Sequence, residues 1–417
     1  MEEVKSLGYN ENMNLAAVNA ILLFALTVPL VMKYRILPTE GTPYWLFGVL
    51  FILLITNVLV SLFSKADRVR QVCIWGSIAI ALGGVLWTSI VDRARTAPAL
   101  GVHDIILQQE AAMRYLIEGK NPYKETYFGT PVESFHYADS TGKSALNPAL
   151  YHFVMPPWYL VFPFLFYFPA TSILGFFDGR MVLGAGMIVT LYLLWRWFRN
   201  KELGILAVLL TALSPATVDY FIEGRSDGFV LPWLVGALFA LDRKKWFLSA
   251  VLMGLSLMSK QTTWIILPYY IGFLWMRRRL SPLAVLVGIV ALLSVPFLLW
   301  DSRAFIESTI LYLSGNSATS YPVSGYGLGM VLYEFGFIRD LGAYYPFIVW
   351  QLVVSIAALT LCFRWIKKTT TVSILILTYS ITLFLFWYTS RYFNNSHVAF
   401  LSWIFALGVL RYLDEKS

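Results

Sequence analysis

The sequence predicts an all-α, polytopic membrane protein with about twelve transmembrane helices. Hydrophobic residues make up 58% of the 417 residues and charged residues only 13%, about half the charged fraction that soluble domains carry. The mean hydropathy is +0.66. Apolar runs long enough to cross a bilayer recur along the whole chain. Together these observations exclude a soluble protein with a large core.

The expected spans are apolar runs separated by charged residues or turn signals. They are 14–32, 44–63, 73–91, 179–197, 203–222, 226–241, 245–259, 261–276, 282–300, 344–363, 371–388 and 396–413. A further apolar run, 156–175, holds four prolines. Proline removes a backbone hydrogen bond and kinks a helix, so this run is a weaker candidate for crossing.

Short loops rich in Lys and Arg indicate the orientation. They are 65–70, 196–201, 242–245, 277–279, 364–368 and 411–416. All of them, and both termini, fall on one side only if 156–175 does not cross. We therefore interpret that run as a re-entrant or interfacial segment, with Lys33 and Arg35 as the exceptions to the rule. The net charge of +8 then reflects cytoplasmic helix ends rather than nucleic-acid binding.

This orientation predicts five parts along the chain. They are N-terminal transmembrane helices (1–91), a first exterior loop with interfacial helices (92–178), a transmembrane core (179–300), a second exterior loop (301–343) and C-terminal transmembrane helices (344–417). The first loop has 87 residues (178 − 92 + 1). Loops of that length are usually functional or form a small domain.

The segment HDIILQQEAAMRYLIEGKNPY, residues 103–123, predicts an amphipathic helix on the membrane surface. Asp104 at its start is either an N-cap or a functional carboxylate. Glu110 and Arg114 have the i,i+4 spacing of a surface ion pair. The tripeptide 121–123 is typical of a turn that ends a helix.

The order of these motifs resembles a known enzyme superfamily. Asp104, EGKNPY, the proline-rich MPPWYLVFP and GLSLMSKQTTWIILPYY (254–270) resemble the multi-pass GT-C glycosyltransferases. The likeness is strongest to the polyprenyl-phosphate-mannose-dependent branch that includes bacterial alpha-mannosyltransferases (GT87-like), and it covers about residues 100–275. One departure is that Asp104 follows the third expected span, whereas the family's Asp follows the first.

The resemblance implies a GT-C-type fold in which Asp104 is the catalytic base and 92–178 is the catalytic loop. It implies inverting transfer of a sugar, with mannose expected, from a polyprenyl-phosphate donor to a glycan, lipid or protein acceptor. The active site would face the exterior of the cell membrane, or the lumen of the endoplasmic reticulum in a eukaryote. A carboxylate at the water–lipid boundary can serve as general base, especially if partial burial raises its pKa toward the operating pH.

The leaving phosphate of such a donor requires positive charge or oriented hydrogen-bond donors. The exterior candidates are Lys260, Arg391, His397 and Arg225. Snorkelling of Lys260 and interfacial anchoring of Arg391 and His397 are the alternatives. The expected substrate pocket comprises Glu110, Arg114, Asn121, Tyr123, Glu223, Asp227 and Gln261. A hydrated turn is the alternative for residues 219–227.

No cofactor is expected. The sequence contains no HxxH, HExxH or DxD spacing, so we also expect no required metal. Two other functions stay open. A transporter or lipid flippase would place charges inside the bundle, but the middles of the expected spans hold almost no ionisable residues. A polysaccharide polymerase or ligase would use a lipid diphosphate donor.

Overall fold

The computed structural model describes residues 2–34, 44–63, 66–96, 99, 101–138, 142–317 and 319–417, with the backbone alone for residues 2–14 and 34. Arg35, one of the two expected exceptions to the charge rule, lies outside these residues. The other exception, Lys33, donates to the carboxylate of Asp219 at 2.6 Å. This ion pair gives Lys33 a partner of opposite charge.

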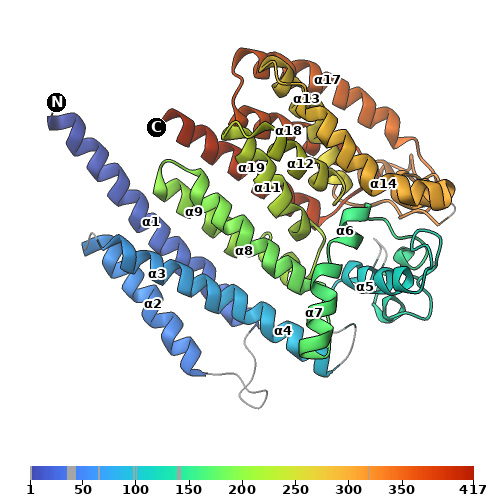
Figure 1. Cartoon of the computed structure of the whole chain (residues 1–417), viewed down its shortest axis with the longest axis horizontal. Coiled ribbons are helices and arrows are strands. Elements are labelled where there is room, and N and C mark those ends of the chain that lie inside the picture. Colours follow the sequence, from blue (N-terminus) through green and yellow to red (C-terminus); the bar gives the residue numbers. More distant parts are fainter. Residues whose placement is uncertain are drawn as a thin grey trace.

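Long and medium helices form one bundle (Figure 1). They are α1 (Glu2–Tyr34), α2 (Tyr44–Phe63), α3 (Asp67–Ile78), the π-helical turn η2 (Ala79–Gly83), α4 (Gly84–Arg95), α8 (Arg180–Trp197), α9 (Lys201–Leu213), α11 (Asp227–Asp242), α12 (Trp246–Leu257), α13 (Leu267–Met276), α14 (Pro282–Ile306), α17 (Phe347–Lys368), α18 (Val372–Tyr388) and α19 (Asn395–Lys416). Both termini lie at the same end of this bundle (Figure 1).

Short elements complete the chain, most of them at the end of the bundle opposite the termini. They are α5 (Asp104–Ile117), η3 (Pro131–Ser134), η4 (Pro148–Leu150), α6 (Pro157–Val161), α7 (Phe164–Leu174), α10 (Val218–Glu223), η5 (Gln261–Ile266), η6 (Glu307–Leu311), α15 (Tyr312–Ser314), β1 (Ser324–Gly325), α16 (Leu328–Glu334) and β2 (Tyr392–Phe393). The strands β1 and β2 pair in parallel, Ser324 with Tyr392 and Gly325 with Phe393.

The chain is an all-α membrane protein, but the expected count of twelve spans is not confirmed. By length and composition, seven helices among the described residues can cross a membrane. They are Leu15–Lys33, Tyr44–Phe63, Asp67–Arg95, Pro157–Leu174, Pro282–Ser314, Phe347–Lys368 and Asn395–Lys416. The run 203–222 breaks between α9 and α10, and 261–276 begins as the 3₁₀ helix η5 before α13. These interruptions shorten several expected spans.

The segment α6–α7 starts and finishes at one end of the bundle, which bears on whether it crosses. The end of α4 and the start of α8 meet there, because Arg93 contacts Asp178 at 2.8 Å and Arg180 donates to Ser89 at 2.8 Å. These contacts fit the expectation that 156–175 does not cross, but Pro157–Leu174 is also long and apolar enough to span a membrane. The interfacial placement therefore stays a prediction.

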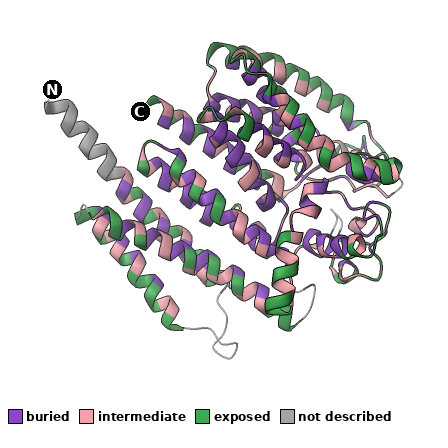
Figure 2. Cartoon of the chain, viewed as in Figure 1, coloured by how far each residue is buried: buried purple, intermediate pink, exposed green. Residues whose placement is uncertain are grey.

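The buried core runs along α8, α9, α11, α12, α18 and α19, whereas α2, α14 and α17 present exposed apolar faces (Figure 2). Apolar side chains on such faces are expected where lipid replaces water as the solvent. The core therefore holds the ends of several helices in fixed positions, and the functional residues described next lie at those ends.

Candidate active site

The start of α5 places a carboxylate at the end of the bundle. Asp104 is the first residue of this helix, and His103 precedes it as the N-cap residue. One carboxylate oxygen of Asp104 lies 2.7 Å from Nδ1 of His103, and the other accepts a hydrogen bond from the Asn147 side-chain amide at 2.9 Å. Two neighbours therefore fix the orientation of the carboxylate.

The interpretation of Asp104 as the N-cap is wrong. The cap position belongs to His103, whose Nδ1 lies 3.4 Å from the amide of Ile105. A protonated Nδ1 that donates to Asp104 at 2.7 Å cannot also accept from that amide, so the shorter contact prevails. The carboxylate of Asp104 therefore does not cap the N-terminus of α5.

The pKa of Asp104 is lowered rather than raised. Burial alone would raise it, but the charge and hydrogen bond of His103, the amide of Asn147 and the charge of Arg225 outweigh burial. The carboxylate is therefore ionised and ready to accept a proton at neutral pH.

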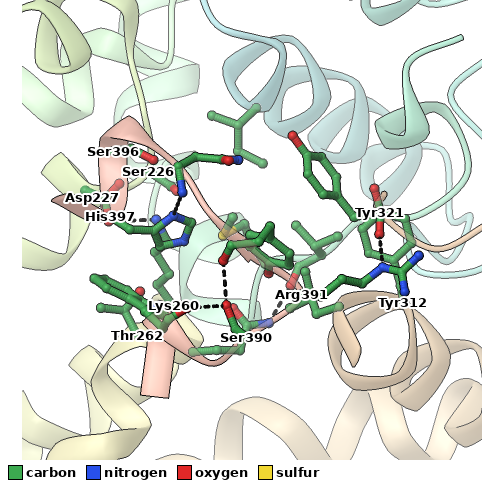
Figure 3. Close-up of a pocket in the computed structure, with 18 of the residues that line it drawn as sticks. Ser226, Asp227, Lys260, Thr262, Tyr312, Tyr321, Ser390, Arg391, Ser396 and His397 are labelled. Atoms are coloured by element: carbon green, nitrogen blue, oxygen red, sulfur yellow. Dashed lines mark hydrogen bonds and ion pairs between the residues drawn. The ribbon is translucent and has the colours of Figure 1, made fainter. Parts of the chain in front are cut away.

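A cavity of about 450 Å³ lies in front of this carboxylate. Seven of the predicted site residues line it, from four separate parts of the chain: Asp104, Arg225, Asp227, Lys260, Gln261, Arg391 and His397. Figure 3 shows Asp227, Lys260 and His397 together on one side, with Arg391 beside Tyr321 on the other. The ends of α5, α10, α12 and α18 meet here because the bundle core aligns those helices.

The cationic side of the cavity is built around Lys260. Its ammonium group lies 2.7 Å from the carboxylate of Asp227, and both side chains are largely buried. The guanidinium of Arg225 stacks on the ring of Tyr220 at 4.3 Å. The ring of His397 accepts the backbone N–H of Asn394 through Nδ1 at 3.0 Å, which leaves the proton of a neutral ring on Nε2. Lys260, Arg225 and Nε2–H of His397 can thus donate hydrogen bonds to an anion.

Arg391 has a different function from the one expected from the sequence. Its guanidinium donates to four backbone carbonyls, those of Tyr321, Leu341, Gly342 and Ala343. A guanidinium has five N–H groups, so almost all of its hydrogen-bonding capacity is already used. Arg391 anchors residues 321–343 through these carbonyls, and it has little capacity left for a phosphate.

Gln261 is likewise occupied by backbone groups. Its side-chain amide donates to the carbonyl of Val154 at 2.7 Å and to that of Thr309 at 3.1 Å. These two bonds join the segment before α6, the start of η5 and the turn η6 around the cavity. Gln261 therefore lines the cavity and at the same time fixes three of its walls.

Glu110 and Arg114 do not line the cavity. Glu110 faces the opposite side of α5, where Arg93 donates to both of its oxygens at 2.7 and 2.8 Å and the backbone of Gly179 donates at 3.1 Å. Arg114 is exposed. The i,i+4 ion pair expected between them is wrong, because a cation from α4 takes the place of Arg114.

The NPY turn and Glu223 also lie outside the cavity. Asn121 accepts the amide of Tyr123 in a local turn, and the hydroxyl of Tyr123 donates to the carbonyl of Met155 at 2.9 Å. The ring of Tyr123 packs against Phe297 and Phe305 of α14. This turn ends the helix, as expected, and anchors the first exterior loop on the bundle. Glu223 lies beside Arg225, 40% of its side chain exposed.

The cavity is also lined by many apolar side chains. They include Trp264 and Ile265 of η5, Ile310 and Leu313 beyond α14, Phe347 and Ile348 of α17, and Leu383, Phe386 and Trp387 of α18. Trp264, Ile310 and Ile348 are 37%, 45% and 48% exposed. Ile310 belongs to the candidate span Pro282–Ser314 and Ile348 to Phe347–Lys368. Part of the apolar lining therefore comes from helices long and apolar enough to cross a membrane.

Sequence reasoning did not identify several residues around Asp104. It assigned no role to His103, which contacts Asp104 directly. Asn147 had one available signal, the Asn–Pro pair that starts η4, which marks a turn but not a partner for Asp104. Among the described residues, no group of three or more His, Cys, Asp or Glu side chains is arranged to hold a metal ion; the absence of a required metal stays a prediction.

Comparisons with known proteins give one match. The sequence model of glycosyltransferase family 87 matches residues 153–390, more than half of the chain. Searches of curated proteins and of solved structures found no match. The matched region contains Arg225, Asp227, Lys260 and Gln261, but it begins after Asp104 and ends before His397.

Proposed function

The chain belongs to glycosyltransferase family 87, and on that premise we propose that it transfers mannose from a polyprenyl-phosphate donor to a glycan, lipid or protein acceptor. Asp104 is the catalytic base in this proposal. The observation that carries it is the cavity, which combines an ionised carboxylate, basic side chains and apolar residues from helices of membrane length. A lipid-linked phosphate requires all of these surroundings at once.

The lining of the cavity suits the two parts of such a donor. The polyprenyl chain would lie along the apolar residues, against Trp264, Ile310 and Ile348. The phosphate would lie near Lys260, Arg225 and Nε2–H of His397. Positioned cations and N–H donors stabilise a leaving phosphate because they are already oriented where charge develops.

The reaction follows from these positions. The acceptor hydroxyl oxygen attacks the anomeric carbon and forms the new glycosidic bond, while its proton passes to the carboxylate of Asp104. The bond between the anomeric carbon and the phosphate oxygen breaks, and its electron pair leaves with the phosphate. Attack opposite the leaving group inverts the anomeric carbon. General-base assistance of this kind typically contributes about 10²–10⁴-fold.

The positions of the charged loops support an exterior active site. The basic helix ends and both termini lie at one end of the bundle, and α5 lies at the other (Figure 1). The start of α5 lines the cavity. With the basic end in the cytoplasm, the cavity faces the exterior of the cell membrane, or the lumen of the endoplasmic reticulum in a eukaryote. Residues 92–178 and 301–343 are the exterior loops in this arrangement.

The test of this function replaces Asp104 and a control carboxylate on the same helix. Asp104→Asn keeps the size and the hydrogen bond from Asn147 but removes the base, so turnover should fall about 10²–10⁴-fold. Glu118→Gln, an exposed change at the other end of α5, should retain turnover. Release of polyprenyl phosphate from polyprenyl-phosphate mannose measures both. Near-normal turnover of the Asn variant would exclude Asp104 as the base.

The same assay separates the alternatives. A transporter or flippase would require a proton or sodium gradient, whereas the glycosyltransferase turns over in detergent without one. A polymerase or ligase would prefer a diphosphate donor, so polyprenyl monophosphate and diphosphate sugars are compared side by side. Preference for the diphosphate would overturn the proposed donor.

A further inference from the structure

We propose that a second groove, adjoining the cavity, binds the acceptor and that this acceptor is an oligosaccharide; the inference rests on the proposed function. The groove has a volume of about 1000 Å³. Six residues line both spaces: His103, Phe135, Tyr137, Arg225, Tyr321 and Asn394. A molecule in the groove therefore meets a molecule in the cavity at a wall that includes His103, the direct neighbour of Asp104.

The lining of the groove has the chemistry that a sugar requires. Tyr137, Tyr321 and Tyr326 provide aromatic rings, and Tyr326 is 63% exposed. The C–H faces of a sugar ring pack on aromatic faces, and its hydroxyls pair with amides and carboxylates. Asn395 and Glu223 supply such groups at the groove.

The groove is held together by specific contacts between distant parts of the chain. The strand pair β1–β2 joins the second exterior loop to the segment before α19, and the amide of Tyr326 donates to the carbonyl of Phe393 at 2.9 Å. The hydroxyl of Ser324 donates to the side chain of Asn394 at 3.1 Å. Gly325 has φ = +91°, and a Cβ there would lie 2.2 Å from the Phe393 carbonyl. Tyr326 is thus fixed in position at the groove.

The position of the groove favours a sugar over a lipid acceptor. Apart from Asn395, the first residue of α19, none of its described lining residues belongs to a membrane-length helix. The cavity, by contrast, draws lining residues from α17 and from the span Pro282–Ser314. A lipid acceptor would need an apolar path from the bilayer, and of these two spaces, as the described residues line them, the cavity alone draws on such helices.

The test measures transfer and binding with the full-length protein in lipid nanodiscs. Polyprenyl-phosphate mannose is the donor, and the acceptor probes are a panel of trisaccharides, a long-chain diacylglycerol and a serine-rich peptide. We expect mass spectrometry to find the product on a trisaccharide. Tyr326→Ala should raise the KM for that trisaccharide about tenfold, which corresponds to about 1.4 kcal/mol, with a much smaller change in kcat. Tyr326→Trp, which keeps a stacking face, should restore the wild-type KM.

The matched control is Tyr344→Ala. Tyr344 is 55% exposed in the same exterior loop region and lines neither the groove nor the cavity. Equal KM values for Tyr326→Ala and Tyr344→Ala would overturn the proposal, and so would transfer to the diacylglycerol or the peptide alone. Hydrolysis of the donor by the wild-type protein without any acceptor tests the proposed function separately. Hydrolysis without binding of any trisaccharide would refute the acceptor site but not the enzyme.

Discussion

Replacement of Arg93 by methionine tests the ion-pair cluster that joins α4, α5 and α8. Arg93 donates to both oxygens of Glu110 at 2.7 and 2.8 Å and to Asp178 at 2.8 Å. Asp178 would keep its bonds from Arg180. Glu110 would keep only the backbone N–H of Gly179 at 3.1 Å. The loss therefore falls on one carboxylate, Glu110, whose side chain is only 12% exposed.

The magnitude follows from that uncompensated charge. Removing one partner of a buried ion pair costs about 3–5 kcal/mol. Burial already raises the pKa of Glu110 in the native protein despite Arg93, and losing Arg93 raises it further. A carboxyl whose folded pKa lies above its unfolded pKa binds a proton preferentially in the folded state. The stability deficit should therefore be largest at about pH 8 and shrink as the pH falls toward about pH 5.

The assay is thermal unfolding of the purified protein in detergent, followed by tryptophan fluorescence at several pH values. Arg114→Met is the control, because Arg114 is exposed on the same helix. The double variant Arg93→Met/Glu110→Leu removes both partners and should regain most of the lost stability. The reasoning would be refuted if Arg93→Met lost no more stability than Arg114→Met. It would also be refuted if the double variant were no more stable than Arg93→Met.

Two further predictions concern the site. In His103→Ala, the pKa of Asp104 should rise, because the charge and hydrogen bond of His103 no longer counter the effect of burial. The acidic limb of the kcat/KM profile should therefore move to higher pH. A limb that stays in place or moves to lower pH would contradict the role of His103. Gly325→Ala and Gly336→Ala both impose a positive φ on alanine, at a cost of about 1–3 kcal/mol, but only Gly325 has a neighbour within 4 Å. Gly325→Ala should therefore lower the Tm further and also raise the acceptor KM, and equal Tm values would argue against a rigid β1–β2 pair.

Much of the helix layout could be predicted from apolar periodicity, but contacts between distant helices could not. The start of α5 at Asp104 follows from its sequence pattern, and so does the turn at 121–123. The partner of Glu110 could not be predicted in this way. Arg93 contacts it from α4, and no local residue spacing indicates a contact between these two helices. The placement of His103 at the N-cap position was missed for a related reason. Histidine is not among the usual capping residues.

The candidate site was predicted in part because exterior helix ends gather at one end of a bundle. Lys260, Arg225 and His397 could be proposed together from this orientation and from the family resemblance, before any distance was known. Arg391 satisfied the same criterion, yet its guanidinium binds backbone carbonyls. The path of the loop at 321–343 decides that outcome, and a loop path depends on contacts that its sequence does not specify.

The contacts of Arg391 have a consequence for how this protein can diversify. Arg391 recognises main-chain carbonyls, which every amino acid possesses, rather than side chains. Substitutions in the second exterior loop therefore leave its anchor intact as long as the backbone path persists. Positions such as Tyr326 can change during evolution without unfolding the loop that carries them. The anchoring of the loop by Arg391 is therefore independent of which side chains the loop carries.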